Sequence, residues 1–201
     1  TGVQTCALPI SGCVGSFWSL VCEAHHPGWR KAALDRMVDA GVKYGLGLQR
    51  LNLLRDTSED LALGRCYWPD EQLASVGMDA QKLVCAVKDR DMLALIPMLP
   101  LMKTWIHQTR AGLSLGIAYG NGITSWRLRA ASALPALIGL QTLNLIEKAG
   151  VSALVDPVKV PRSWVRGLLW KCLTGSLSRR GLPALGKRLG ADSPLLERAL
   201  S

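Results

Sequence analysis

Two carboxylates in the stretch NLLRDTSEDLALGRCYWP (52–69) have a spacing that suits metal binding. On a helix, Asp56 and Asp60 lie four residues apart and project from the same face. The same line along the helix runs back through Asn52 and Gln49 to Gly45. Carboxylates in this arrangement can share Mg²⁺, which takes oxygen ligands and commonly bridges to the phosphates of a substrate. The spacing therefore indicates a site for a phosphorylated ligand held through a hard cation.

An exposed helix face is the alternative interpretation of the same stretch. Arg55 and Glu59 form an i,i+4 pair on the next row, and a pair of this kind contributes only about 0.3–0.5 kcal/mol at the surface. Two aspartates four residues apart are also common by chance. The spacing alone does not decide between a solvated face and a metal site.

The composition is that of a compact chain with an excess of positive charge. Of the 201 residues, 49% are hydrophobic and 19% are charged, which excludes a disordered chain. The net charge of +9 suits nucleic acid, anionic lipid or a polyphosphate substrate as a partner. Nucleic acid is disfavoured, because no basic stripe is interleaved with aromatic residues and the strongest motif is acidic.

The cysteines and apolar segments bear on the compartment. The six cysteines are scattered without a CxxC pair, which indicates thiols in a reducing compartment and a cytoplasmic protein. Cys22, His25 and His26 have the chemistry of zinc ligands, but no second ligand pair follows at the spacing of a zinc site. No stretch reaches the ~20 continuous apolar residues of a membrane span, and residues 133–146 are expected to form a buried helix.

Helical periodicity is far more frequent than strand patterns, so the chain is predicted to be all-α. Pro97 and Pro100 are expected to kink or break one helix, and Pro135 is expected to bend another. The helices are expected over residues 15–25, 31–64, 70–76, 79–96, 102–118, 124–149 and 161–175.

Three glycines interrupt the longest predicted helix. Gly41, Gly45 and Gly47 each cost about 1 kcal/mol relative to Ala inside a helix. Such a cost indicates that something approaches the backbone closely there, either a ligand or a neighbouring helix.

The two ends of the chain differ from the middle. Residues 1–11 lack the charged start of a signal peptide and resemble translated adapter sequence, so we expect a non-native leader there. Residues 12–175 are then the C-terminal part of a single helical domain whose gene begins further upstream. Residues 176–201, rich in Gly, Ser and Arg, are expected to form a loosely ordered basic tail.

The segment LGLQRLNLLRDTSEDLALGRCYWPDEQL (46–73) resembles the second aspartate-rich region of the squalene/phytoene synthase family. A second segment, GCVGSFW (12–18), resembles the glycine-containing segment that follows that family's first aspartate-rich region. The residues that match the two motifs are Gly12, Val14, Gly15, Gly45, Leu48, Gln49, Asn52, Arg55, Asp56, Glu59, Asp60, Gly64, Arg65, Tyr67 and Pro69.

The resemblance implies an isoprenoid-synthase-type bundle of helices around a central cavity. Members of the family join two prenyl diphosphates head to head through a cyclopropyl diphosphate, with Mg²⁺ held by two DxxxD motifs on facing helices. Squalene synthases then reduce the intermediate with NADPH, whereas phytoene synthases lose a proton. Tyr67, Trp68 and Pro69 are closer to the squalene synthase pattern. The resemblance therefore predicts a farnesyltransferase that makes squalene, with a phytoene- or dehydrosqualene-type synthase as the alternative.

The resemblance also assigns roles to single residues. Asp56 and Asp60 are Mg²⁺ ligands, and Gln49 and Asn52 are catalytic residues near the substrate and the later carbocation. Arg55 and Arg65 have a structural or a diphosphate-binding role, and Lys159 and Arg162 could meet the phosphate of NADPH. The prenyl pocket is expected to be lined by Gly12, Val14, Gly15, Gly45 and Leu48.

Two family features are absent upstream of Gly12. No acidic residue precedes it, so the first DxxxD motif has no counterpart, and Cys6, Ala7 and Leu8 stand where the family has a tyrosine. We therefore predict that this chain has no turnover by itself. Two other classes stay open. One is a non-catalytic helical protein that binds a prenyl diphosphate or a partner subunit, and the other is a peripheral membrane protein whose basic tail contacts anionic lipid.

Overall fold

The fold is known from a computed structural model, which describes residues 2–178 and 180–198, with side chains for 12–178 and 180–196. All regular elements among these residues are helices, as predicted. They are α1 (Gly2–His25), α2 (Leu34–Ala62), α3 (Asp70–Ser75), α4 (Ala80–Lys88), α5 (Met92–Leu95), α6 (Leu99–Asn121), α7 (Trp126–Ala149), α8 (Arg162–Ser176), α9 (Gly181–Arg188) and α10 (Ser193–Arg198), with 3₁₀ turns η1 (Ile96–Met98) and η2 (Gly150–Leu154).

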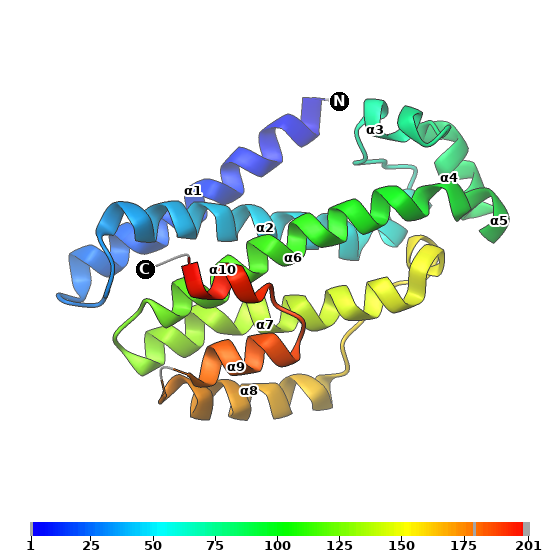
Figure 1. The fold of residues 1–201 in the computed structure, drawn as a ribbon. Coiled ribbons are helices and arrows are strands. Elements are labelled where there is room, and N and C mark those ends of the chain that lie inside the picture. Colours follow the sequence, from blue (N-terminus) through cyan, green and yellow to red (C-terminus); the bar gives the residue numbers. More distant parts are fainter. Residues whose placement is uncertain (1, 179, 199–201) are drawn as a thin grey trace.

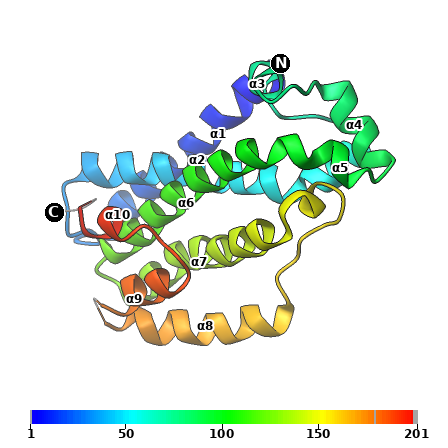
Figure 2. The ribbon, with the colours of Figure 1, turned by 45° about the vertical axis from the view of Figure 1, so that its right-hand side comes forward.

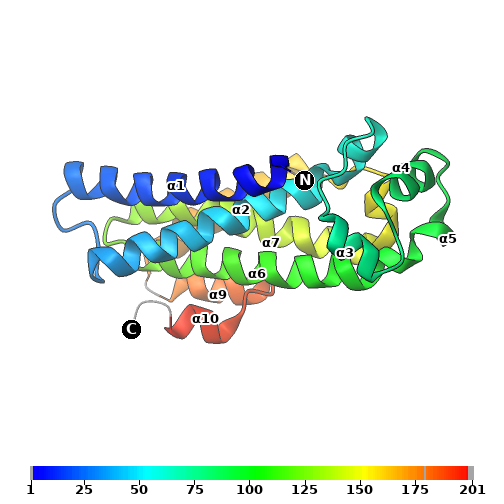
Figure 3. The ribbon, with the colours of Figure 1, turned by 90° about the horizontal axis from the view of Figure 1, so that it is seen from above.

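The long helices form an antiparallel stack (Figure 1). Helices α1 and α2 lie on one side, α6 and α7 lie in the middle, and α8 with α9 lies on the opposite side, as the turned view in Figure 2 also shows. Seen from above, α1, α2 and α6 run side by side, and the short helices α3, α4 and α5 gather at one end (Figure 3).

The core lies between α2, α6 and α7. Leu113 of α6 and Leu137 and Leu140 of α7 have no exposed surface, and Leu51 of α2 is buried against them. These positions recur at helical spacing, so each helix presents one apolar stripe to the others.

Glycines let the backbones of α1, α2 and α6 touch. A Cβ atom on Gly15 of α1 would lie only 2.0 Å from the carbonyl oxygen of Gly41 in α2. A Cβ atom on Gly47 of α2 would lie 2.9 Å from the Cα atom of Gly112 in α6. Gly41 and Gly47 therefore serve helix–helix packing, which was one of the two interpretations that the sequence left open.

The turn between α6 and α7 is held by a buried arginine. The guanidinium of Arg129 donates to the carbonyl oxygens of Ile123 (3.0 and 2.9 Å) and Thr124 (3.0 Å). It also donates to the carbonyl oxygen of Ser176 at 3.0 Å, which joins the start of α7 to the end of α8.

The single helix predicted over 79–96 is wrong. Helix α4 ends at Lys88, and Arg90 adopts the left-handed conformation with φ 55°. Asp91 then caps α5 by accepting hydrogen bonds from the backbone N–H groups of Leu93 and Ala94. The break lies before the prolines because an aspartate N-cap starts a new helix there. Pro100, in turn, sits in the first turn of α6, where its missing N–H costs nothing.

The helix predicted over residues 124–149 is confirmed as α7, with Pro135 inside it. The expectation for the C-terminal tail differs from the structure. The tail expected to be loose contains α9 and α10, and this part of the chain returns to the bundle: the amide of Asn144 donates to the carbonyl oxygen of Leu189, and the backbone N–H of Asp192 donates to Ser114 Oγ. Periodicity in these short helices is too brief to read from sequence.

The contact between α2 and α6 leads to a stability prediction. In Gly47→Ala, the new methyl group must displace the α6 backbone, so we expect a loss of about 1–3 kcal/mol in the free energy of unfolding, measured by urea denaturation. The control is Gly167→Ala, because Gly167 lies in α8 with open space around its Cβ position. This control should gain up to about 1 kcal/mol. Equal effects of the two substitutions would contradict the close contact.

Candidate functional site

The predicted metal-binding aspartates lie in the last two turns of α2. Asp56 accepts two hydrogen bonds from the guanidinium of its neighbour Arg55, at 2.7 and 2.9 Å. Asp60 Oδ1 lies 3.4 Å from Nε of Arg65, and the Asp60 carbonyl oxygen accepts from the Arg65 backbone N–H at 2.8 Å. Gly64, with φ +77°, makes the turn that brings Arg65 back onto the helix end. Each aspartate is thus half-buried beside an arginine.

A basic segment lies beside the same helix end. Lys159 Nζ is 3.5 Å from Glu59 Oε1, although the two residues are a hundred positions apart in the sequence. Both side chains are largely exposed, so this pair contributes little to stability. Arg162 begins α8 and is exposed. The structure therefore places Lys159 next to the acidic stretch, and Arg162 at the start of the helix that follows.

A cavity of about 290 Å³ opens between α1, α2, α6 and α7. This volume is at the small end of the range for ligand pockets, roughly 300–1,000 Å³. Its walls are mostly apolar and aromatic. They are formed by Val14, Gly15, Trp18, Gly41, Tyr44, Gly45, Leu48, Tyr119, Ala131, Ser132 and Pro135.

The polar groups of the cavity wall are bonded to one another. Tyr44 donates from its hydroxyl to the carbonyl oxygen of Ser132 (3.0 Å), and Trp18 Nε1 donates to Ser132 Oγ (3.2 Å). The hydroxyl of Tyr119 shares a hydrogen bond of 2.9 Å with Ser19 Oγ. Burial raises the pKa of Tyr44 and raises that of Tyr119 to about 12, so both phenols stay neutral at physiological pH. The cavity therefore offers a ligand mainly carbon surface.

One face of α2 connects the cavity to the carboxylates. At 100° per residue, Gly45 and Leu48 at the cavity lie on the same side of the helix as Asn52, Asp56 and Asp60. The rise of 1.5 Å per residue separates Leu48 from Asp56 by about 12 Å along the axis. Half-buried Gln49 and Asn52 lie between the two parts.

The donor set at the carboxylates fits Mg²⁺ in part. Among the described residues, no group of three or more His, Cys, Asp or Glu side chains is close enough to hold a metal ion. Asp56 and Asp60 provide two hard oxygen donors at an accessible helix end. Mg²⁺ is usually held by one or two carboxylates, with substrate phosphates and water completing its coordination. The pair would therefore supply the protein's share of such a site, alongside two cations that also attract phosphate.

Comparison with known proteins identifies the family. The sequence matches the squalene/phytoene synthase family over residues 9–164, which is most of the chain. The chain belongs to this family. The all-α structure agrees with the isoprenoid-synthase-type helical fold that the membership implies.

One curated relative in this family is phytoene synthase 1, chloroplastic, of Solanum lycopersicum. The two sequences are 26% identical over 163 residues, which is 74% of this chain and 37% of that relative. The chain thus spans well under half the length of the relative that it matches. No solved structure shows significant similarity to the chain.

The predicted pocket residues of this family member fall into two groups. Val14, Gly15, Gly45 and Leu48 all line the cavity. Gly12 does not line it; a Cβ atom there would lie 3.2 Å from Val42 Cγ1 of α2.

Sequence reasoning missed most of the aromatic and α7 side of the cavity. Tyr44 is one turn before Leu48 and next to Gly45, so helical spacing alone could have found it. Tyr119 and Ser132 are more than 70 positions further along the chain, and nothing local marks them as neighbours of Gly45.

The five cysteines with described side chains are free thiols. Of the helices described, none combines the length and the apolar character needed to cross a bilayer.

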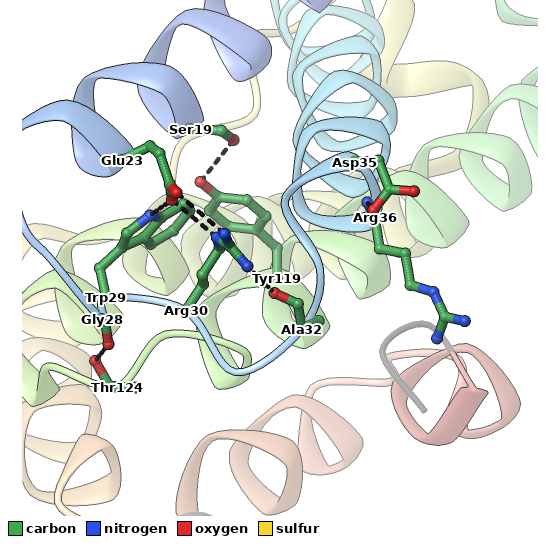
Figure 4. Close-up of polar contacts among 10 residues, drawn as sticks. All are labelled: Ser19, Glu23, Gly28, Trp29, Arg30, Ala32, Asp35, Arg36, Tyr119 and Thr124. Carbon is green, nitrogen blue, oxygen red and sulfur yellow. Dashed lines mark hydrogen bonds and ion pairs between the residues drawn. The ribbon is translucent and has the colours of Figure 1, made fainter.

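A polar cluster fixes the α1 wall of the cavity (Figure 4). Glu23 at the end of α1 accepts hydrogen bonds from the guanidinium of Arg30 at 2.8 and 3.0 Å and from Trp29 Nε1 at 2.7 Å. Thr124 Oγ1 donates to the carbonyl oxygen of Gly28, which ties this loop to the α6–α7 turn. The loop after α1 is thereby anchored near Tyr119, whose hydroxyl meets α1.

The Glu23 cluster leads to a pH-dependent prediction. The hydrogen bonds from Arg30 and then Trp29 lower the pKa of Glu23 from its ordinary value of 4.5 to about 2. Because the pKa is lower in the folded state, the charged carboxylate stabilises the fold above about pH 4.5. This contribution is lost as the pH falls toward 2. Glu23→Gln should therefore lower the thermal midpoint at pH 7, and the difference from the unsubstituted protein should narrow between pH 4.5 and pH 3.

The control for this experiment is Glu71→Gln, which removes an exposed carboxylate on α3. Its effect should be small at every pH. A gap between Glu23→Gln and the unsubstituted protein that stays constant down to pH 3 would show that the ionised carboxylate is not the source of the stability.

Proposed function

We propose that this chain supplies the prenyl-binding cavity and one metal-binding motif of an enzyme that joins two prenyl diphosphates head to head. The observation that carries the proposal is the continuous face of α2, which runs from an apolar cavity at Gly45 and Leu48 to two carboxylates at Asp56 and Asp60. An amphiphile with a long apolar chain and a diphosphate head has the same two-part chemistry. Membership of the squalene/phytoene synthase family supports the same reaction class.

Different residues of the chain would take different roles in such a reaction. Asp56 and Asp60 would hold Mg²⁺, which when bound offsets the charge that develops on a departing diphosphate. Arg55 and Arg65 already lie beside these carboxylates and can turn to the phosphate oxygens, since Arg binds phosphate with two parallel hydrogen bonds. Gln49 and Asn52, between head and chain, would orient the first carbon atoms of the substrate.

The cavity would protect the cationic stage of the reaction. With a prenyl chain bound, its carbon-rich walls would keep out water, which would otherwise capture an allylic cation. The aromatic side chains of Trp18, Tyr44 and Tyr119 line it, and an aromatic ring attracts a cation that lies over its face within about 6 Å. Because the phenols stay neutral and hydrogen-bonded, they offer their rings without acting as nucleophiles.

For the product, we favour the squalene branch, in which farnesyl diphosphate is condensed and the cyclopropyl diphosphate is reduced by NADPH. The Tyr67-Trp68-Pro69 sequence supports this choice, and Lys159 beside Glu59 supplies a cation near the diphosphate end. Arg162 is the second candidate for the phosphate of NADPH. A phytoene- or dehydrosqualene-type synthase without the reductive step is the alternative. Product formation by the full-length enzyme with and without NADPH separates the two.

The carboxylate pair gives the main test of the proposed function. We expect the chain to bind farnesyl thiodiphosphate in the presence of Mg²⁺, measured by calorimetry, and Asp56→Asn with Asp60→Asn to weaken that binding by tenfold or more. We also expect no release of diphosphate from farnesyl diphosphate, because the described residues gather no group of three or more metal-ligating side chains.

The control variant is Asp39→Asn. Asp39 lies near the other end of α2 and pairs with Lys43 at 2.6 Å. Like Asp56, it is therefore an aspartate of α2 that forms an ion pair with a basic residue. It should bind the ligand as the unsubstituted chain does. Binding that ignores Mg²⁺, or an equal loss in the two variants, would contradict the assignment.

The cavity gives a second, separate prediction. Gly45→Leu puts a side chain into the space between α1 and α2 and should displace about two methylene groups of a prenyl chain. At about 0.8 kcal/mol for each, binding of farnesyl thiodiphosphate should weaken about tenfold or more. Mg²⁺-dependent binding of inorganic diphosphate should not change. Gly167→Leu, the same replacement at an exposed helical glycine, serves as the control.

A further inference from the structure

The outer face of α8 exposes large apolar side chains that the proposed reaction does not use. Trp170 is 71% exposed, Leu177 just after the helix is 68% exposed, and Leu169 is 41% exposed. Helix α8 lies along the edge of the bundle, at the bottom of Figures 1 and 2 and on the side opposite α1.

The inner face of α8 is fixed to the bundle. Leu168, Cys172 and Ser176 are buried, and Cys172 Sγ lies 3.6 Å from the carbonyl oxygen of Ala130 in α7. The buried guanidinium of Arg129 holds the last turn of α8 through Ser176. Trp170 therefore projects from a helix whose opposite face is packed on the bundle.

The segment that contains these apolar side chains is rich in Lys and Arg. The sequence contains no Asp or Glu between Asp156 and Asp192, whereas that stretch has eight Lys and Arg residues. Arg166 is one turn before Trp170, and Lys171 follows it, and both are exposed. Among the described residues, neither takes part in an ion pair.

A second exposed tryptophan, at the start of α7, lies close to the C-terminal end of α8. Trp126 begins α7 and is 40% exposed, with the guanidinium carbon of Arg127 5.4 Å from its ring centroid. The bond from Arg129 to Ser176 places this start of α7 beside the end of α8. Exposed tryptophan with arginine thus recurs at two places on this side of the molecule.

The exposed apolar side chains of α1 belong to a helix with no Lys or Arg. Val14 and Phe17 are 63% and 66% exposed, yet the sequence has no Lys or Arg before Arg30. Exposed apolar side chains therefore occur on both helices, and of the two helices α8 is the one whose own sequence also carries exposed Arg and Lys.

We propose that the outer face of α8 docks on an anionic lipid bilayer. Tryptophan favours the boundary between headgroups and hydrocarbon, because its ring is apolar while its N–H can meet water or headgroups. Arg166 and Lys171 would meet the anionic headgroups, and each basic residue near such a surface strengthens binding about fivefold. The helix would lie flat on the membrane, since its other face is buried in the bundle. This inference does not depend on the proposed catalysis.

The test is co-sedimentation of the 201-residue chain with vesicles of phosphatidylcholine, with or without phosphatidylglycerol. We expect binding only to the anionic vesicles and a marked loss at high salt. Trp170→Gln should weaken binding about tenfold, and Arg166→Glu with Lys171→Glu should weaken it by tenfold or more.

Each variant has a matched control. Phe17→Gln removes an equally exposed aromatic side chain on the opposite side, and Lys88→Glu with Lys103→Glu makes the same change in net charge at exposed lysines elsewhere. Both controls should bind like the unsubstituted chain.

Three outcomes would overturn the proposal. The first is an equal loss of vesicle binding in Trp170→Gln and Phe17→Gln, which would indicate nonspecific adsorption through any exposed aromatic side chain. The second is equal binding to both kinds of vesicle. The third is a Trp170→Gln variant that converts a dimer to a monomer in solution while vesicle binding is unchanged, because the surface would then contact protein.

Discussion

Helix α2 lies within backbone contact of two neighbours at once, α1 on one side and α6 on the other. Gly15 meets Gly41 on the first side, and Gly47 meets Gly112 on the second, at separations that leave no room for a Cβ atom. These two contacts fix where α2 runs. Everything that α2 carries toward the proposed ligand, from Gly45 to Asp60, takes its position from them.

The cavity lies next to the glycine contacts of α2, where the bulky side chains of Tyr44 and Tyr119 take the place of glycine. Tyr44 and Tyr119 lie among the glycines and occupy the space beside them, and their hydroxyls bond to Ser132 and Ser19. These bonds hold the phenols in the wall of the cavity. Tight packing at the glycines and an apolar cavity next to them are therefore two results of one arrangement.

The distribution of charge separates the molecule into distinct surfaces. The carboxylates at the end of α2 are each accompanied by an arginine, so the site holds anionic and cationic groups together. In the proposed function, Mg²⁺ would take the place of the arginines beside the carboxylates, and the diphosphate would take the place of the carboxylates beside the arginines. The stretch around α8, by contrast, is basic without acids, which suits an extended anionic surface better than a small ligand.

Sequence determined the all-α class, the long helix over α2 and the shared face of Asn52, Asp56 and Asp60, because helical periodicity is a local property. The family motif around residues 46–73 is also local. The helix predicted over residues 70–76 matches α3, and Gly77 after it has φ +73°. The break at Arg90 and the helices after α8 were missed, because short helices have too few turns to show a period.

Only the tertiary structure decided which glycines contact helices, which residues close the cavity and where Lys159 lies. Nothing in the sequence shows that a Cβ atom on Gly41 would meet the backbone of α1, or that one on Gly47 would meet the backbone of α6. Tyr119, Ser132 and Pro135 reach the cavity through the packing of α6 and α7 against α2, over separations of more than 70 residues from Gly45. No local pattern encodes such contacts, because they depend on how whole helices cross.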